Sequence, residues 1–157
     1  MAEYSAVAVQ TVNPGETVVF TNTEVPCNRG FVRHRDGTGN FLLAGYVPPQ
    51  YGCWCCCRRQ RAANYMVDFG ADIAIPEGET VGPISVAITI DGATIPASTM
   101  IVTPAAVEQY FNVSRAINAD IWKGCCESVA VRNTSEIPIL VQNANIVFSR
   151  PDLNITR

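Results

Sequence analysis

The sequence predicts an all-β domain built as an antiparallel β-sandwich, and three observations support that prediction. Apolar and polar residues alternate with a period of two along much of the chain, as in half-buried strands. The 10 prolines and 11 glycines fall mostly between these runs, where turns are expected. Helix signals are weak. The best of them, at residues 103–110, can also be interpreted as a loop before a strand at residues 109–113, and we expect a short turn there at most.

Three predicted strands lie in the first half of the chain. Residues 7–12 alternate between two faces, and a Pro-Gly turn at residues 13–16 separates them from a second strand at residues 17–20. The third strand, residues 65–72, has the clearest alternation. Its faces are Tyr65, Val67, Phe69 and Ala71 on one side and Met66, Asp68, Gly70 and Asp72 on the other.

Further strands are predicted in the second half. Residues 85–90 run into Asp91-Gly92, and residues 93–95 follow. Asp-Gly between two β-rich runs favours a type I′ hairpin, because both central residues of that turn need a positive φ. Residues 128–132 form another strand, and residues 137–148 form the last one. Strict alternation in the last strand puts Ile139, Val141, Asn143, Asn145 and Val147 on one face and Leu140, Gln142, Ala144, Ile146 and Phe148 on the other.

Composition predicts a single domain, residues 1–157, with a Cys-rich loop insertion at about residues 46–61. A chain of 157 residues and 17.0 kDa is long enough for one sizeable core. Its net charge of -3 gives no basic surface for nucleic acid. No apolar run approaches the roughly 18 residues of a membrane helix. We therefore expect neither nucleic-acid binding nor membrane insertion.

The low charge content predicts association of identical copies. Charged residues make up only 16% of the chain, against about 25% in a typical soluble domain. Obligate interfaces resemble a domain core cut in half, so part of the apolar excess is expected at such an interface. The alternative is that Ser, Thr, Asn and Gln supply the polar surface.

The first residues, 1–5, lack the charged and apolar regions of a secretory signal. We therefore expect synthesis in the cytoplasm without a signal peptide. The expected final location is a virion or an extracellular surface, reached by assembly into a particle that lysis releases.

The seven cysteines leave three interpretations open. They are Cys27, Cys53, Cys55, Cys56, Cys57, Cys125 and Cys126. In the first interpretation, all seven are disulfide candidates that tie the loop to the strand ends, although an odd number cannot be fully paired within one chain. In the second, zinc is held by Cys53, Cys55, Cys56, Cys57, Cys125 and Cys126, although C-x-x-C spacing is absent. In the third, the thiols are free and behave as small buried apolar groups.

We expect no enzymatic activity, no catalytic residues and no cofactor. The sequence contains no nucleophile elbow, zinc-protease motif or glycine-rich phosphate loop. A catalytic thiol needs a partner base, and the single histidine, His34, lies among charged residues, where we expect a solvated surface side chain. Asp68 and Asp72 share a strand face, as glycosidase carboxylates can, but we interpret them as the polar side of an outer strand.

Several strand motifs follow one another in a recognisable order. They are Tyr65-x-Val67-x-Phe69-x-Ala71, the run of residues 84–92 that ends in Asp91-Gly92, Val129-x-Val131-x-Asn133, and Ile139-x-Val141-x-Asn143. Together they resemble the jelly roll shared by tumour necrosis factor (TNF), the globular head of the first complement component, and the heads of spore-surface collagen-like proteins. Residues 26–30, 101–107 and 123–126 are also similar to short proteins of clostridial gut bacteria and their phages.

The resemblance implies a compact homotrimer that decorates a larger particle, such as a capsid or tail. We therefore expect a non-enzymatic structural protein, a trimeric phage virion component that serves as capsid decoration, head fibre or tail-associated head. The alternative is a surface recognition module that binds host glycan or protein. In that case Tyr51 and Trp54, with Tyr46, are the residues expected to stack on sugars.

Overall fold

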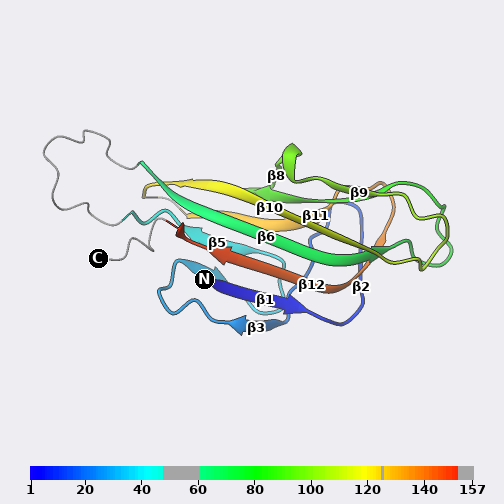
Figure 1. Ribbon diagram of the computed structural model, residues 1–157, viewed down its shortest axis with the longest axis horizontal. Coiled ribbons are helices and arrows are strands. Elements are labelled where there is room, and N and C mark those ends of the chain that lie inside the picture. The colour runs from blue at the N-terminus through cyan, green and yellow to red at the C-terminus, as the bar shows by residue number, and fades with distance from the viewer. Residues whose placement is uncertain (48–60, 125, 152–157) are drawn as a thin grey trace, which may run out of the picture.

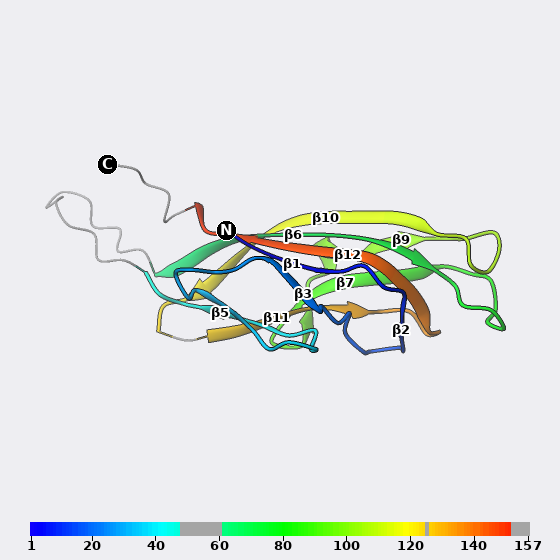
Figure 2. The same ribbon diagram turned by 90° about the horizontal axis from the view of Figure 1, so that it is seen from below.

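The computed structural model describes residues 1–47, 61–124 and 126–151, and these residues form two antiparallel β-sheets packed face to face. Figure 1 shows the long strands running side by side, with both described ends of the chain at the same end of the molecule. Figure 2, turned by 90°, separates the two layers. The predicted all-β sandwich is confirmed.

The first sheet is six-stranded in the order β10-β6-β12-β1-β3, with β2 also paired to β12. Its strands are β1 (Ala2–Ala6), β2 (Gln10–Val12), β3 (Asn22–Val25), β6 (Ala62–Ala74), β10 (Phe111–Trp122) and β12 (Ile139–Ser149). The first and last strands are neighbours, since Ala2 lies opposite Phe148. This return of the last strand beside the first is the arrangement that the sequence resemblance implies.

The second sheet has the order β4-β5-β11-β7-β8, with β9 also paired to β7. Its strands are β4 (Val32–His34), β5 (Phe41–Ala44), β7 (Ile84–Ile90), β8 (Ala93–Thr94), β9 (Met100–Val102) and β11 (Cys126–Asn133). One short 3₁₀ helix, η1 (Pro96–Ser98), lies between β8 and β9 and was not predicted. In the described residues, no helix is long and apolar enough to span a membrane.

The core fills the space between the sheets with alternate side chains of the long strands. In β6 the buried side is the one predicted, with Tyr65, Val67, Phe69 and Ala71 each no more than 1% exposed. Burying a large apolar side chain contributes about 1.5–3 kcal/mol. The largest fully buried residues are Tyr65, Phe20, Phe41, Phe69, Phe148, Leu43, Ile73, Ile75, Ile84, Ile88, Ile121 and Ile139.

The predicted hairpin at Asp91-Gly92 is confirmed. Asp91 has φ 47° and Gly92 has φ 80°, both in the left-handed region that a type I′ turn requires. The Asp91 side chain also accepts hydrogen bonds from the backbone N–H and hydroxyl of Ser128, at 2.7 and 3.1 Å. Residues 103–110 form no helix, as expected.

The predicted alternation of the last strand is wrong in its C-terminal part. The pairing of β12 with β6 shifts register between Gln142 and Asn145, and Asn143 has φ 51°. This is a β-bulge, in which one extra residue moves the following side chains to the opposite face. Its inward residues are consequently Ile139, Val141, Ala144, Ile146 and Phe148. Asn occupies the bulge because it tolerates the left-handed conformation better than most residues.

Two N-terminal predictions also need correction. Residues 7–9 are not in a strand, and Val7 and Val9 are 62% and 52% exposed. Strand pairing instead involves residues 2–6 and 10–12 on either side of them. Residues 17–20 form only isolated bridges, from Thr17 to Arg132 and from Phe20 to Thr38, rather than a strand. The apolar side chains there are buried by tertiary packing without a regular ladder.

Candidate functional site

The outward face of the first sheet is a wide surface of small and polar side chains. It is built by every second residue of β6 and β10, which lie in register from Phe111 opposite Ile73 to Trp122 opposite Ala62. The outward residues of β1, β6, β10 and β12 include Ser5, Asn64, Asp68, Gly70, Asp72, Asn112, Ser114, Ala116, Asn118, Asp120 and Asn145. We call this surface the amide face.

Most carboxylates of the amide face accept hydrogen bonds from neutral side chains on neighbouring strands. Asn145 donates to Glu3 at 2.7 Å, Ser5 donates to Glu24 at 2.6 Å, and Asn64 donates to Asp120. These bonds hold the side chains of a solvent-facing surface in defined positions.

Asp72 is held most firmly of these carboxylates. Asn112 and Asn143 each donate to one of its oxygens at 3.0 Å. These two hydrogen bonds, led by the one from Asn143, lower the pKa of Asp72 below its ordinary value. A glycosidase general acid needs a raised pKa, so the lowered pKa of Asp72 does not fit the role of that acid. The interpretation of Asp68 and Asp72 as the polar side of an outer strand agrees with this geometry.

The amide face is electrostatically one-sided. The six strands of this sheet contain the acidic residues Glu3, Glu24, Asp68, Asp72 and Asp120 but a single basic residue, Arg115. Arg115 turns away from the face, because its Nε donates to the carbonyl oxygen of Ala97 in η1 at 3.0 Å. The face therefore presents carboxylates and side-chain amides without a cation.

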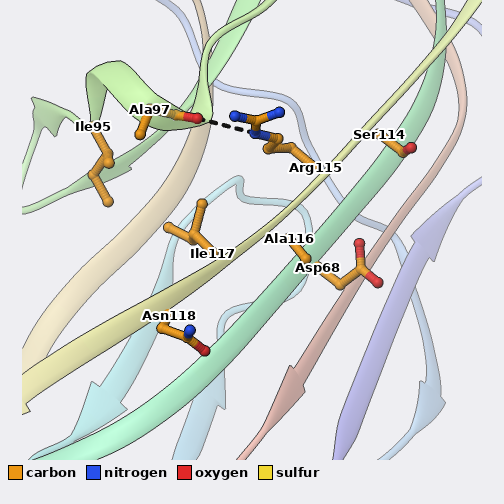
Figure 3. A pocket seen from close by; sticks show the side chains of 8 residues that line it. All are labelled: Asp68, Ile95, Ala97, Ser114, Arg115, Ala116, Ile117 and Asn118. Carbon is orange, nitrogen blue, oxygen red and sulfur yellow. Dashed lines mark hydrogen bonds between the residues drawn. The ribbon is translucent and has the colours of Figure 1, made fainter.

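A hollow of about 740 Å³ lies along the edge of the same sheet. It is lined by Asp68, Ile95, Ala97, Ser114, Arg115, Ala116, Ile117 and Asn118. Figure 3 shows Arg115 reaching from β10 to Ala97, with Ile95 and Ile117 on that side of the strand. The lining combines an apolar part, two opposite charges and side-chain hydroxyl and amide groups.

The prediction of a solvated His34 is wrong. Its side chain is only 3% exposed. Its ring stacks on Phe41 with centroids 4.5 Å apart and lies 5.0 Å from the ring of Tyr4. Nε2 lies 3.0 Å from the carbonyl oxygen of Thr38. A histidine flanked by charged residues is buried here because its ring packs between Phe41, its partner on the neighbouring strand, and Tyr4 from the opposite sheet.

The end of the sandwich that holds both described chain ends contains a second aromatic arrangement. Tyr65 donates to the carbonyl of Ala44 at 2.7 Å, and its hydroxyl also lies 3.1 Å from that of Phe31. The guanidinium of Arg150, which is 2% exposed, lies 4.9 Å from the centre of the Tyr65 ring. Burial raises the pKa of Tyr65, and Arg150 partly opposes that shift.

Of the seven cysteines, the structure describes Cys27 and Cys126. They do not form a disulfide with each other. Cys27 packs against the core, and its sulfur accepts a hydrogen bond from the backbone of Val32 at 3.4 Å. Cys53, Cys55, Cys56, Cys57 and Cys125 lie outside the described residues, as do the stacking candidates Tyr51 and Trp54. Tyr46 is described and is 60% exposed.

No metal site is found in the part of the chain that the structure describes, because no three His, Cys, Asp or Glu side chains there are grouped suitably. The zinc interpretation depends on cysteines outside that part and is not tested by this result.

The sequence predicted only the start of β10, in the strand expected at residues 109–113, and residues 114–122 were missed. Its outward residues end in Trp122, which is 62% exposed, and its edge carries Arg115 and Ile117. Alternation from Asn112 to Trp122 was the available signal. It was weak because Ser, Ala and Asn occupy the outward positions and Arg115 interrupts the apolar ones.

Comparison with known proteins identifies the fold. No family model matches the chain, and no curated protein sequence matches it. The globular domain of zebrafish complement 1qA protein is similar in structure, with a TM-score of 0.53 at 11% identity over 93% of this chain and 94% of that one. Eiger TNF from S. frugiperda reaches a TM-score of 0.61 at 11% identity over 95% of this chain and 90% of that one. The fold is a TNF-like jelly roll.

At 11% identity these likenesses establish the fold alone. Function has to be argued from the surfaces described above.

Proposed function

We propose that the chain is a non-enzymatic structural protein that assembles as a homotrimer and decorates the surface of a phage particle. The observation that carries the proposal is the amide face, a broad surface that no other described segment covers. Apart from Met66 and Trp122, most of its side chains are short, and most of its carboxylates are already hydrogen-bonded. Short, pre-ordered side chains lose little conformational entropy on association, which favours a surface of this kind as an interface.

The charges of the amide face make the proposal specific. Three copies that meet over this face bring carboxylates together with no basic side chain of the face to balance them. Among these carboxylates, Asp68 is the one without a hydrogen-bond partner in the described residues. Salt screens the repulsion between exposed charges that lie farther apart than the Debye length, which falls from about 30 Å at 0.01 M to about 3 Å at 1 M. The trimer should therefore tighten as ionic strength rises.

The test is light scattering after size exclusion, at several salt concentrations. We expect a mass near three times 17.0 kDa, with a lower dissociation constant at 0.5 M salt than at 0.05 M. Asp68→Asn should strengthen the trimer at low salt, whereas Asp91→Asn, in the hairpin of the other sheet, serves as the matched control. A lone subunit at micromolar concentration in every salt would refute the trimer.

The particle assignment has its own test. Phage particles purified from the strain that encodes the chain should contain its peptides in stoichiometric amounts by mass spectrometry.

A glycan array separates this proposal from a recognition role. Specific glycan binding that Trp54→Ala abolishes would replace the structural role with recognition.

Disulfide crosslinks form part of the same proposal, since bridges would reinforce a particle subunit by about 2–4 kcal/mol each. Mass measurement after alkylation without reduction tests this. Fewer than seven modified thiols are expected, and seven would remove the crosslinks.

A further inference from the structure

β10 is the longest edge strand in the described part of the chain. It runs over 12 residues and pairs with β6 without any register shift. The other edges are β2 with 3 residues, β3 with 4, β4 with 3, β8 with 2 and β9 with 3. Natural sheets protect edges by shortness, bulges, proline, lysine, inward-pointing charges or a covering helix or loop. β10 has none of the first four features, and its protection is limited to Arg115 on the inward side and the contact of Arg115 with η1.

The outer side of β10 offers backbone groups that the described residues leave without a partner. In an antiparallel strand, each neighbour takes the N–H and C=O groups of alternate residues. With β6 on one side only, roughly half of the residues of β10 direct these groups to the open side. No hydrogen bond from them to another described segment is present.

The hollow beside β10 is lined mostly by residues of that edge strand. Side chains from both faces of the sheet line it: Ser114, Ala116 and Asn118 from the amide face, and Arg115 and Ile117 from the inward side. A cavity confined to one face would be lined by one of these sets only. Because both contribute, the hollow follows the strand edge itself, as Figure 3 shows around β10.

We propose that β10 is a docking edge, on which an extended segment of another protein adds as a further strand of the first sheet. The open backbone groups select an extended segment, because a helix already satisfies its own backbone. Ile95, Ala97 and Ile117 receive an apolar side chain of that segment. This inference goes beyond the proposed trimer, since it concerns attachment to a different partner.

Arg115 specifies the chemistry of the partner strand. Its Nε is bonded to Ala97, and its two terminal nitrogens have no partner in the described residues. A carboxylate on the inward side of the added strand matches these donors, because arginine–carboxylate bonds are charge-assisted. The partner segment is therefore extended, apolar on its inward side and acidic opposite Arg115.

A second copy of β10 does not meet this requirement. Residues opposite each other in paired strands share a face, and the residues of β10 on the side of Arg115 are Phe111, Val113, Ile117, Ala119 and Ile121. None of them is acidic. The nearest acid of the strand, Asp120, lies on the amide face. Symmetric pairing of two β10 strands therefore leaves Arg115 without a carboxylate.

The experiment uses the full chain and three synthetic octapeptides at millimolar concentration. The first alternates Thr and Val and carries one Glu in place of a central Val; the second has Lys in place of that Glu; the third is the first with alternate backbone nitrogens methylated. Hydrogen exchange is measured for residues 111–122. We expect the Glu peptide to slow exchange of the open-side amides by at least about tenfold, and the methylated peptide to have no effect.

Charge reversal provides the matched variant. Arg115→Glu should reverse the preference, so that the Lys peptide protects β10 more than the Glu peptide does, whereas Arg29→Glu, at an exposed position elsewhere, should leave the preference unchanged. Absence of protection by the Glu peptide would overturn the proposal. Protection that appears without peptide and keeps increasing with protein concentration after the mass by light scattering has become constant would also overturn it, by assigning the edge to a second copy. The peptide result does not depend on the trimer mass, so the two proposals fail separately.

Discussion

The two halves of the core are held together by different interactions. The half around β4 and β5 is aromatic, with Phe41 at its centre. The Phe41 ring lies 4.9 Å from Tyr4, 5.2 Å from Phe20, 4.9 Å from Phe148 and 4.5 Å from His34. Such ring pairs contribute about 0.5–1.5 kcal/mol each beyond the area that they bury.

The half around β2 and the start of β12 is aliphatic and is organised by one buried amide. Asn133 is fully buried, and its side chain donates to the carbonyls of Val12 at 2.9 Å and Ile137 at 3.0 Å and accepts from the N–H of Ser135 at 2.8 Å. Its backbone bonds Glu16 and Gly15, both at 2.9 Å. We therefore expect the stability of the first half to depend on how well its aromatic side chains fill the core. The stability of the second half should depend on whether every buried polar group around Asn133 keeps its hydrogen bond.

The largest effect is expected at the aromatic centre. Phe41→Ala should lower the free energy of unfolding by about 3–5 kcal/mol, because it removes a buried ring and leaves a cavity. Urea unfolding followed by fluorescence measures this. Phe41→Leu, which keeps most of the volume, should cost clearly less. Equal costs for the two variants would contradict the dependence on shape.

At the buried amide of Asn133, stability should depend on hydrogen bonding rather than on side-chain volume. Asn133→Leu has nearly the same volume but leaves two carbonyls and one N–H unsatisfied, so we expect a loss of roughly 2–4 kcal/mol in the same unfolding experiment. The matched control is Asn118→Leu on the amide face, where the side chain is exposed to water. A neutral Asn133→Leu would show that volume alone matters in this half as well.

A smaller loss of unfolding free energy is expected when a hydrogen bond, rather than a ring, is removed from the aromatic half. Tyr65→Phe keeps the ring and removes the hydroxyl that lies beside the carbonyls of Ala44 and Phe31. The expected loss in unfolding free energy is about 1–2 kcal/mol, well below that of Phe41→Ala. Tyr46→Phe, at an exposed tyrosine, is the control and should change nothing measurable.

The smallest effect lies outside both halves, on the amide face. The pKa of Asp72 is lowered in the folded chain, so its ionised form contributes stability above the ordinary value of 3.8 that is lost as pH falls from there toward the folded pKa. Asp72→Asn should therefore flatten this part of the acid unfolding profile and change stability at pH 7 less than Tyr65→Phe does. An unchanged profile below pH 4 would contradict the role of its two amide donors.

The sequence predicts the fold well where one physical rule governs a segment. Alternation in residues 65–72 gave the correct buried side of β6, and Asp91-Gly92 gave the correct turn, because each depends on local chemistry alone. The prediction for residues 7–12 was wrong for residues 7–9, because Val7 and Val9 have the alternation of a strand but do not pair with a neighbouring strand, whereas residues 10–12 form β2. His34 was misplaced for a related reason, since its burial depends on pairing with Phe41 of the next strand and on packing against Tyr4 of the other sheet.

The candidate surfaces were less predictable than the fold. The amide face depends on which strands become neighbours, and only then do Asn112 and Asn143 meet Asp72. The docking edge depends on β10 having no partner beyond β6, which is a property of strand order. Both features depend on contacts between segments that are far apart in the sequence, so the pattern within one segment does not predict them.

The bulge at Asn143 has a consequence for how this chain tolerates changes in length. Removing that codon would give strict alternation in which Ile139, Val141, Ala144, Ile146 and Phe148 all stay on the inward face. Adding two residues there would also preserve the facing of both parts. Among natural variants, loss of the single bulge residue should therefore be tolerated, whereas a single-residue insertion at this point should be rare.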